Sequence, residues 1–61
     1  MPKLRTVLVD DEPLAREGLR LHLEAEPDIE IIAECADGEA AIAAIREYEP
    51  DLVFLDVQMP G

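Results

Sequence analysis

The sequence is poor in the residues that would cross-link it, anchor it in a membrane or bind it to nucleic acid. Its single cysteine, Cys35, excludes a disulfide framework within the chain. No apolar run approaches the ~20 residues of a membrane-spanning helix. Only 5 basic residues oppose 15 acidic ones, and the net charge of −10 disfavours nucleic acid or an anionic membrane as a partner of this segment. We therefore expect a cytoplasmic protein that binds a cation or a basic partner.

Size and composition set narrow limits on the fold. The chain has 61 residues, of which 49% are hydrophobic, so it holds at most one small domain and its charge does not signal disorder. A domain of this size buries only about 60% of its extended surface and is marginal alone, and such domains often oligomerise. Cys35 lies in a strand-like run, where we expect a small buried hydrophobe. A reactive thiol and an intermolecular disulfide are the alternatives.

Apolar runs alternate with helical patterns along the chain. Strands are predicted at residues 4–9, 29–36 and 51–55, with one helix that begins near Pro13 and is ended by Pro27 and Asp28, and a second helix at residues 39–48. Alternating strands and helices form a parallel sheet with right-handed crossovers. We predict an α/β fold with three layers, in which the first strand is central and the sheet order is 2-1-3.

The first predicted helix carries a broad apolar arc. At ~100° per residue, its small and apolar residues gather on one side: Leu14, Ala15, Gly18, Leu19, Leu21, Leu23 and Ala25. Arg16 and Arg20 fall on the opposite arc, and the order of Glu12 and Arg16 suits an ion pair. His22 falls within the apolar arc, where we expect a partly buried structural histidine. Asp11 or Glu12 is placed to cap the first turn.

Acidic residues follow two of the apolar runs. Asp10, Asp11 and Glu12 follow the first strand, and Asp56 follows the third. If these strands are parallel neighbours, both acidic ends meet at one edge of the sheet, where ligands bind in such folds. Crowded carboxylates repel one another and attract a cation, and hard oxygen ligands suit Mg²⁺. The alternative for the first patch is helix capping, but no helical pattern follows Asp56 within the chain.

An aspartate beside Mg²⁺ can also react. Its carboxylate attacks a phosphoryl group and forms an aspartyl-phosphate, while the metal neutralises the anions. Asp56 is the better candidate for the nucleophile, because it stands singly at a strand end and residues 57–61 can bend backbone groups around it. Asp10 and Asp11 are then metal ligands, one of them through a water molecule.

Three segments resemble the receiver domain of bacterial two-component response regulators: VLVDDEP at residues 7–13, ADGEA at 36–40 and PDLVFLDVQMPG at 50–61. The resemblance implies a flavodoxin-like, doubly wound fold in which Asp56 accepts a phosphoryl group from a histidine kinase. It implies that Asp10, Asp11 and Asp56 hold Mg²⁺ and that the main-chain carbonyl of Gln58 is a further ligand. Residues 11–16 are similar to receivers with a LytTR-type DNA-binding output domain, which implies transcription regulation.

The chain departs from the resemblance in its length. A receiver has five strands and five helices, so residues 1–61 are expected to be its N-terminal half, truncated after the third strand. The switch Ser/Thr and the Lys of the other half are not among them, so we expect impaired phosphotransfer and no measurable response to acetyl phosphate. The third strand would expose its outer edge, from which we expect self-association. DNA would be bound by an output domain outside these residues.

Two other interpretations of the residues stay open. A structural module, either a self-associating half-domain or a pseudo-receiver, would keep the fold without phosphoryl chemistry. A Mg²⁺-dependent phosphohydrolase would use the same aspartate nucleophile, but such enzymes commonly need a second aspartate two residues on, where this chain has Gln58. We expect a phosphoacceptor protein and not an enzyme.

Overall fold

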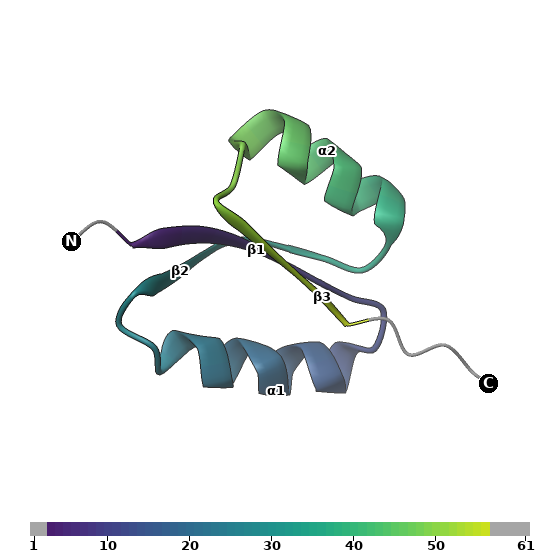
Figure 1. Cartoon of the computed structure of the whole chain (residues 1–61). Coiled ribbons are helices and arrows are strands. Elements are labelled where there is room, and N and C mark those ends of the chain that lie inside the picture. Colours follow the sequence, from purple (N-terminus) through teal and green to yellow (C-terminus); the bar gives the residue numbers. More distant parts are fainter. Residues whose placement is uncertain (1–2, 57–61) are drawn as a thin grey trace.

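A parallel sheet lies between two helices (Figure 1). The computed structural model describes residues 3–56, with Asp56 described by its backbone alone. The elements are β1 (Leu4–Asp10), α1 (Pro13–Glu24), β2 (Ile29–Cys35), α2 (Gly38–Tyr48) and β3 (Leu52–Asp56). Both strand pairs are parallel and the sheet order is β2-β1-β3. Helix α1 covers one face and α2 the other, so the predicted three layers and sheet order are confirmed.

The core forms around the central strand. Residues 6–10 of β1 are all buried, because strands flank β1 on both edges and helices cover both faces. Val7 and Val9 point to the face covered by α2, where they form a cluster with Cys35, Ala41 and Ala44. Leu8 points to the opposite face, and Leu23 of α1 is buried on that side. The buried residues of α2 are thus two small alanines.

Local hydrogen bonds adjust the predicted bounds by a residue. The first strand extends to Asp10, because Asp10 pairs with Asp56 at the end of β3. Helix α2 begins at Gly38 because the Asp37 carboxylate accepts the N–H of Ala40 at 2.8 Å. Strand β2 ends at Cys35, one residue before its predicted end. Strand β3 begins at Leu52, one residue after its predicted start.

Asp51, predicted to begin the third strand, lies just before β3 and forms hydrogen bonds to β1. Its carboxylate accepts the N–H of Arg5 at 2.8 Å, and its own N–H donates to the Arg5 carbonyl at 2.8 Å. The Arg5 side chain also donates to the carbonyl of Glu49 at 3.2 Å. These bonds fasten the start of β3 to the start of β1 and thereby set the register of the two strands.

Neither α1 nor α2, the helices that the structure describes, has the length and apolar character needed to cross a membrane.

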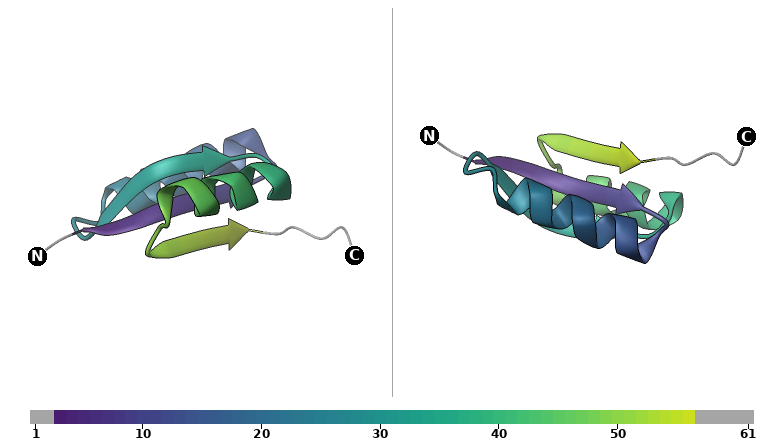
Figure 2. Two further views of the ribbon diagram at one scale, coloured as in Figure 1. Left: turned by 90° about the horizontal axis from the view of Figure 1, so that it is seen from above. Right: turned by 90° about the horizontal axis from the view of Figure 1, so that it is seen from below.

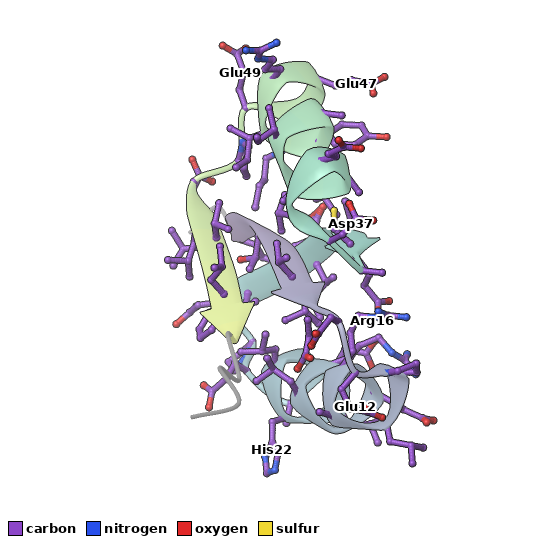
Figure 3. All side chains as sticks on the ribbon, turned by 90° about the vertical axis from the view of Figure 1, so that its right-hand side faces the viewer. Glu12, Arg16, His22, Asp37, Glu47 and Glu49 are labelled. Atoms are coloured by element: carbon purple, nitrogen blue, oxygen red, sulfur yellow. The ribbon has the colours of Figure 1, made fainter. Side chains whose placement is uncertain are left out.

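Helix α1 meets the sheet with a different side from the one predicted. Leu14 and Leu21 are 76% and 57% exposed, although both lie in the apolar arc. His22 is also exposed and points away from the sheet (Figure 3), so its predicted partial burial is wrong. Arg16 and Arg20, predicted to face solvent, are half-buried. The reason is that α1 lies over β1 and β2 and has no contact with β3, so the half of its arc nearer β3 stays uncovered.

Candidate functional site

The carboxyl ends of β1 and β3 lie side by side. The two strands run parallel with Asp10 opposite Asp56, and Figure 2 shows both arrowheads pointing toward the same end of the sheet. Neighbouring strands are about 4.8 Å apart, so the Cα atoms of this pair are close enough for both residues to reach one ion. The predicted meeting of the two strand ends is therefore confirmed at the backbone.

Asp10 is buried and hydrogen-bonded at this edge of the sheet. The residue is 2% exposed, and its Oδ1 accepts the N–H of Glu12 at 2.9 Å. Its Oδ2 is buried and has no hydrogen-bond partner among the residues that the structure describes. Burying a carboxylate oxygen without a partner is costly. Asp10 thus presents a buried oxygen that is available to a further ligand at the end of β1.

The hydrogen bond to Asp10 replaces the helix cap that the sequence predicted. Glu12 is the N-cap residue of α1, but its side chain makes no capping hydrogen bond to the described residues. Its N–H instead binds the carboxylate of Asp10, two residues earlier. Asp11 is exposed and lies between them, at the rim of the same edge. The chain turn from β1 into α1 thus fixes one carboxylate inside the protein and leaves its neighbour in solvent.

The remaining predicted site residues are only partly described. The side chain of Asp56 and the carbonyl of Gln58 lie outside the described part of the chain. Within residues 3–56, no three His, Cys, Asp or Glu side chains converge in a metal-binding group. The backbone brings Asp10 and Asp11 to the end of β3, and their roles as ligands stay predictions.

Sequence reasoning missed Arg16. Its Nη1 donates to the main-chain carbonyl of Asp10 at 2.8 Å, and its Nε lies 3.8 Å from Oε1 of Glu34 on β2. The predicted side-chain pair with Glu12 is wrong, because the guanidinium turns toward β2 (Figure 3) and only the backbone N–H of Arg16 reaches the Glu12 carbonyl. No local signal could have revealed this, because Glu34 becomes a neighbour only when β2 pairs with β1.

Cys35 is a buried free thiol, 5% exposed, as expected for a small core residue. Burial raises the pKa of the Cys35 thiol above its ordinary value, and the negative charge of Asp37 raises it further. The positive charge of Arg16 opposes both effects. The thiol is therefore held neutral in the core and is a poor nucleophile.

Comparison with known proteins gives a consistent result. Residues 6–61 match the family model described as the response regulator receiver domain. The transcriptional regulatory protein BtsR of Salmonella typhi is 53% identical over 57 residues, which are 93% of this chain and 24% of BtsR. The transcriptional regulatory protein DegU of Brevibacillus brevis is 40% identical over 58 residues, which are 95% of this chain and 25% of DegU.

A solved structure shares the fold. The signal receiver domain of the response regulator NarL from Mycobacterium tuberculosis superposes with a TM-score of 0.89 at 39% identity, covering 100% of this chain and 49% of that chain. This chain spans about a quarter of the length of the curated relatives that it matches.

Proposed function

Because the chain belongs to the response regulator receiver domain family, we propose that it carries the phosphoacceptor of a two-component system. In the whole receiver Asp56 accepts a phosphoryl group from a histidine kinase, whereas residues 1–61 alone are impaired in phosphotransfer. The observation that carries this proposal is the register of β1 and β3, which sets Asp10 opposite Asp56 at the carboxyl edge of the sheet. Ligands bind at this edge in parallel α/β sheets. The protein is then a signalling component and not an enzyme acting on other molecules.

The donor set fits Mg²⁺. The buried Oδ2 of Asp10 is a hard, anionic oxygen with no hydrogen-bond partner among the described residues, and Mg²⁺ prefers such ligands. We propose that Asp10, Asp11, Asp56 and the Gln58 carbonyl hold the ion. When bound, it would neutralise the crowded carboxylates and the phosphoryl oxygens.

The chain's own residues have distinct tasks in this proposal. The Asp56 carboxylate attacks phosphorus, an O–P bond forms, the N–P bond of the kinase phosphohistidine breaks, and its electron pair returns to the histidine nitrogen. Asp10, held by the Glu12 N–H, keeps a second carboxylate fixed beside the reacting strand end. Because Asp10 is already held in place, no free energy is needed to reorient it when the reaction occurs.

The wider context also belongs to the proposal. We take residues 1–61 as the N-terminal half of a receiver domain, in line with their cover of 49% of the NarL receiver chain. The similarity to BtsR and DegU, both named transcriptional regulatory proteins, supports transcription regulation through a DNA-binding output domain outside these residues. The buried free thiol of Cys35 supports a reducing compartment, the cytoplasm.

Amide NMR spectra recorded with Mg²⁺ and then with Mg²⁺ and beryllofluoride test the phosphoacceptor role. Beryllofluoride mimics a phosphoryl group on an aspartate. We expect the amide signals of Asp10, Asp11 and Glu12 to shift when Mg²⁺ is added and to shift again when beryllofluoride is added. In Asp56→Asn the shift on adding beryllofluoride should be absent. A second step that persists in Asp56→Asn would show that another residue is the acceptor.

A structural role is the second candidate, favoured by the outer edge of β3. In the described part of the chain this edge has no neighbouring strand, and residues 52–55 are all apolar, with Leu55 60% exposed. We propose that a second copy pairs with it, β3 against β3, because a two-fold contact satisfies both edges and no charge on these residues opposes it.

Sedimentation tests the pairing. We expect association that weakens as the concentration falls and that Leu55→Lys disrupts, because a charge on an edge strand opposes strand addition. Leu4→Lys is the matched control, since Leu4 is 45% exposed on β1. A folded monomer at all concentrations would refute the pairing.

A further inference from the structure

Arg16 is the one described residue whose side chain connects α1 to both the end of β1 and the end of β2. Its Nη1 donates to the Asp10 carbonyl at 2.8 Å, and its Nε approaches Glu34 at 3.8 Å. The side chain is only 24% exposed, so these contacts are shielded from water on most sides. A guanidinium presents its donors in a rigid fork, which suits two simultaneous partners.

We propose that Arg16, braced by Glu34, is a positioning residue that holds Asp10 in the orientation needed for Mg²⁺. This inference rests on the proposed function. Two bonds fix Asp10: the Glu12 N–H holds Oδ1, and the Arg16 guanidinium holds the main-chain carbonyl. With its backbone and one carboxylate oxygen held, Asp10 directs its free Oδ2 in a single direction. Groups that orient a metal ligand affect affinity without touching the metal.

A purely electrostatic role predicts the opposite result from a positioning role. The guanidinium carries a positive charge beside a cation site and repels Mg²⁺, so removing only that charge would tighten binding. Removing the hydrogen bond to the Asp10 carbonyl would instead loosen Asp10 and weaken binding. The sign of the change in affinity therefore distinguishes the two roles.

The chain supplies a matched control in Arg20. Its Nε lies 3.8 Å from Oε2 of Glu34 and its Nη1 lies 3.2 Å from Glu24, and its side chain is 34% exposed. Arg20 thus shares the Glu34 partner and the charge of Arg16, one helical turn farther from the end of β1. Among the described residues, the Arg20 side chain contacts Glu24 and Glu34 but not Asp10, so its removal changes the ion-pair network without releasing Asp10.

The experiment measures Mg²⁺ affinity by NMR titration in the wild type, Arg16→Met, Arg16→Lys and Arg20→Met, with Mg²⁺ alone as the probe. Circular dichroism verifies folding, and Arg16→Leu, which also lacks a donor, serves if Arg16→Met does not fold. We expect Arg16→Met to weaken binding about tenfold and Arg16→Lys, which keeps a donor, to recover part of the loss. Arg20→Met stays within about twofold of the wild type.

A second readout reports the hydrogen bond itself. The carbonyl ¹³C shift of Asp10 without metal should change in Arg16→Met and stay unchanged in Arg20→Met. Three results would each overturn the inference. Arg16→Met could bind Mg²⁺ as tightly as the wild type or more tightly, Arg20→Met could lose as much Mg²⁺ affinity as Arg16→Met, or Arg16→Lys could recover none of the affinity that Arg16→Met loses. A wild type that shows no Mg²⁺-dependent shifts would refute the proposed metal site and, with it, the inference that rests on it.

Discussion

Replacing Asp10 by asparagine should stabilise the metal-free protein while removing its response to Mg²⁺. Asp10 is 2% exposed, and its Oδ2 has no hydrogen-bond partner among residues 3–56. Asparagine keeps the oxygen that accepts the Glu12 N–H and removes the negative charge next to Asp56. If Asp10 is a metal ligand, as proposed, the carboxylate lowers the stability of the metal-free protein and supplies a ligand oxygen, a compromise common at functional sites.

The magnitude follows from the burial of that oxygen. A buried polar group without a partner costs about 1–3 kcal/mol, and more when it is charged. The amide nitrogen that replaces Oδ2 still lacks an acceptor, so part of this cost remains, and we expect Asp10→Asn to gain ~1–2 kcal/mol. For a domain of this size each kcal/mol moves the melting temperature by about 4–8 °C, so the variant should melt roughly 4–16 °C higher.

Thermal and urea unfolding followed by circular dichroism, with and without Mg²⁺, measure the effect. At Mg²⁺ about 100-fold above its dissociation constant, the wild type should gain ~2.7 kcal/mol. The Asp10→Asn variant should gain far less, so the order of stability of the two proteins reverses. Asp11→Asn is the control, because Asp11 is exposed and its metal-free stability should change by less than about 0.5 kcal/mol.

Two results would refute the reasoning. If Asp10→Asn is less stable than the wild type without metal, then the carboxylate is satisfied in solution and its unpartnered oxygen is not a source of instability. If Mg²⁺ stabilises Asp10→Asn as much as the wild type, then Asp10 is not a ligand.

Two further predictions concern the core and the helix ends. Because the pKa of the Cys35 thiol is raised in the folded protein, the thiol of the unfolded chain ionises at a lower pH than the folded one. The contribution of this group to the free energy of unfolding is therefore fully present below the ordinary thiol pKa of 9.0 and is lost as the pH rises through the folded pKa. Unfolding curves between pH 7 and pH 10 should show this loss, and Cys35→Ala should lack it. Asp37→Ala should lower the free energy of unfolding by about 0.5–2 kcal/mol, because it removes the hydrogen bond to the Ala40 N–H. Glu12→Ala should change it little, because the Glu12 side chain makes no capping hydrogen bond to the described residues. Equal losses in urea unfolding of the two variants would contradict this.

Much of the fold follows from local patterns. Continuous apolar runs predicted β1 and β3 as buried strands. Residues 6–10 of β1 are buried, but residues 52–54 of β3 are half-buried and Leu55 is exposed, because β3 has no neighbour on its outer edge among the described residues. The alternation of strands with two amphipathic segments predicted the parallel sheet and its order, which the structure confirms. The acidic residues after these runs predicted a metal site at the carboxyl edge of the sheet. The structure confirms that the two strand ends meet there, and the metal site itself stays a prediction. Most errors at element bounds are single residues and are set by hydrogen bonds such as those between Asp51 and Arg5. Helix α1 differs more, because it ends at Glu24, before the stop predicted at Pro27 and Asp28.

The orientation of α1 was not predictable in the same way. A helical arc as broad as that of α1 allows several rotations against the sheet, and the chosen one buries Leu23 while it exposes Leu14 and His22. The rule for neighbouring helix charges selected Glu12 as the partner of Arg16, but a partner on β2 is used instead. Patterns along one element carry no information about which charges a second element brings.

The amino-acid sequence by itself determined the strands, the helices, the sheet order and the meeting of Asp10 with the end of β3, because each depends on periodicity and on the general geometry of parallel sheets. Only the tertiary structure decided that Oδ2 of Asp10 is buried with no hydrogen-bond partner among the described residues. Only the tertiary structure decided, too, that Arg16 donates to the Asp10 carbonyl while it lies beside Glu34 of β2. These features depend on the distances between atoms of separate elements, which exist only once β1, β2 and α1 have packed together.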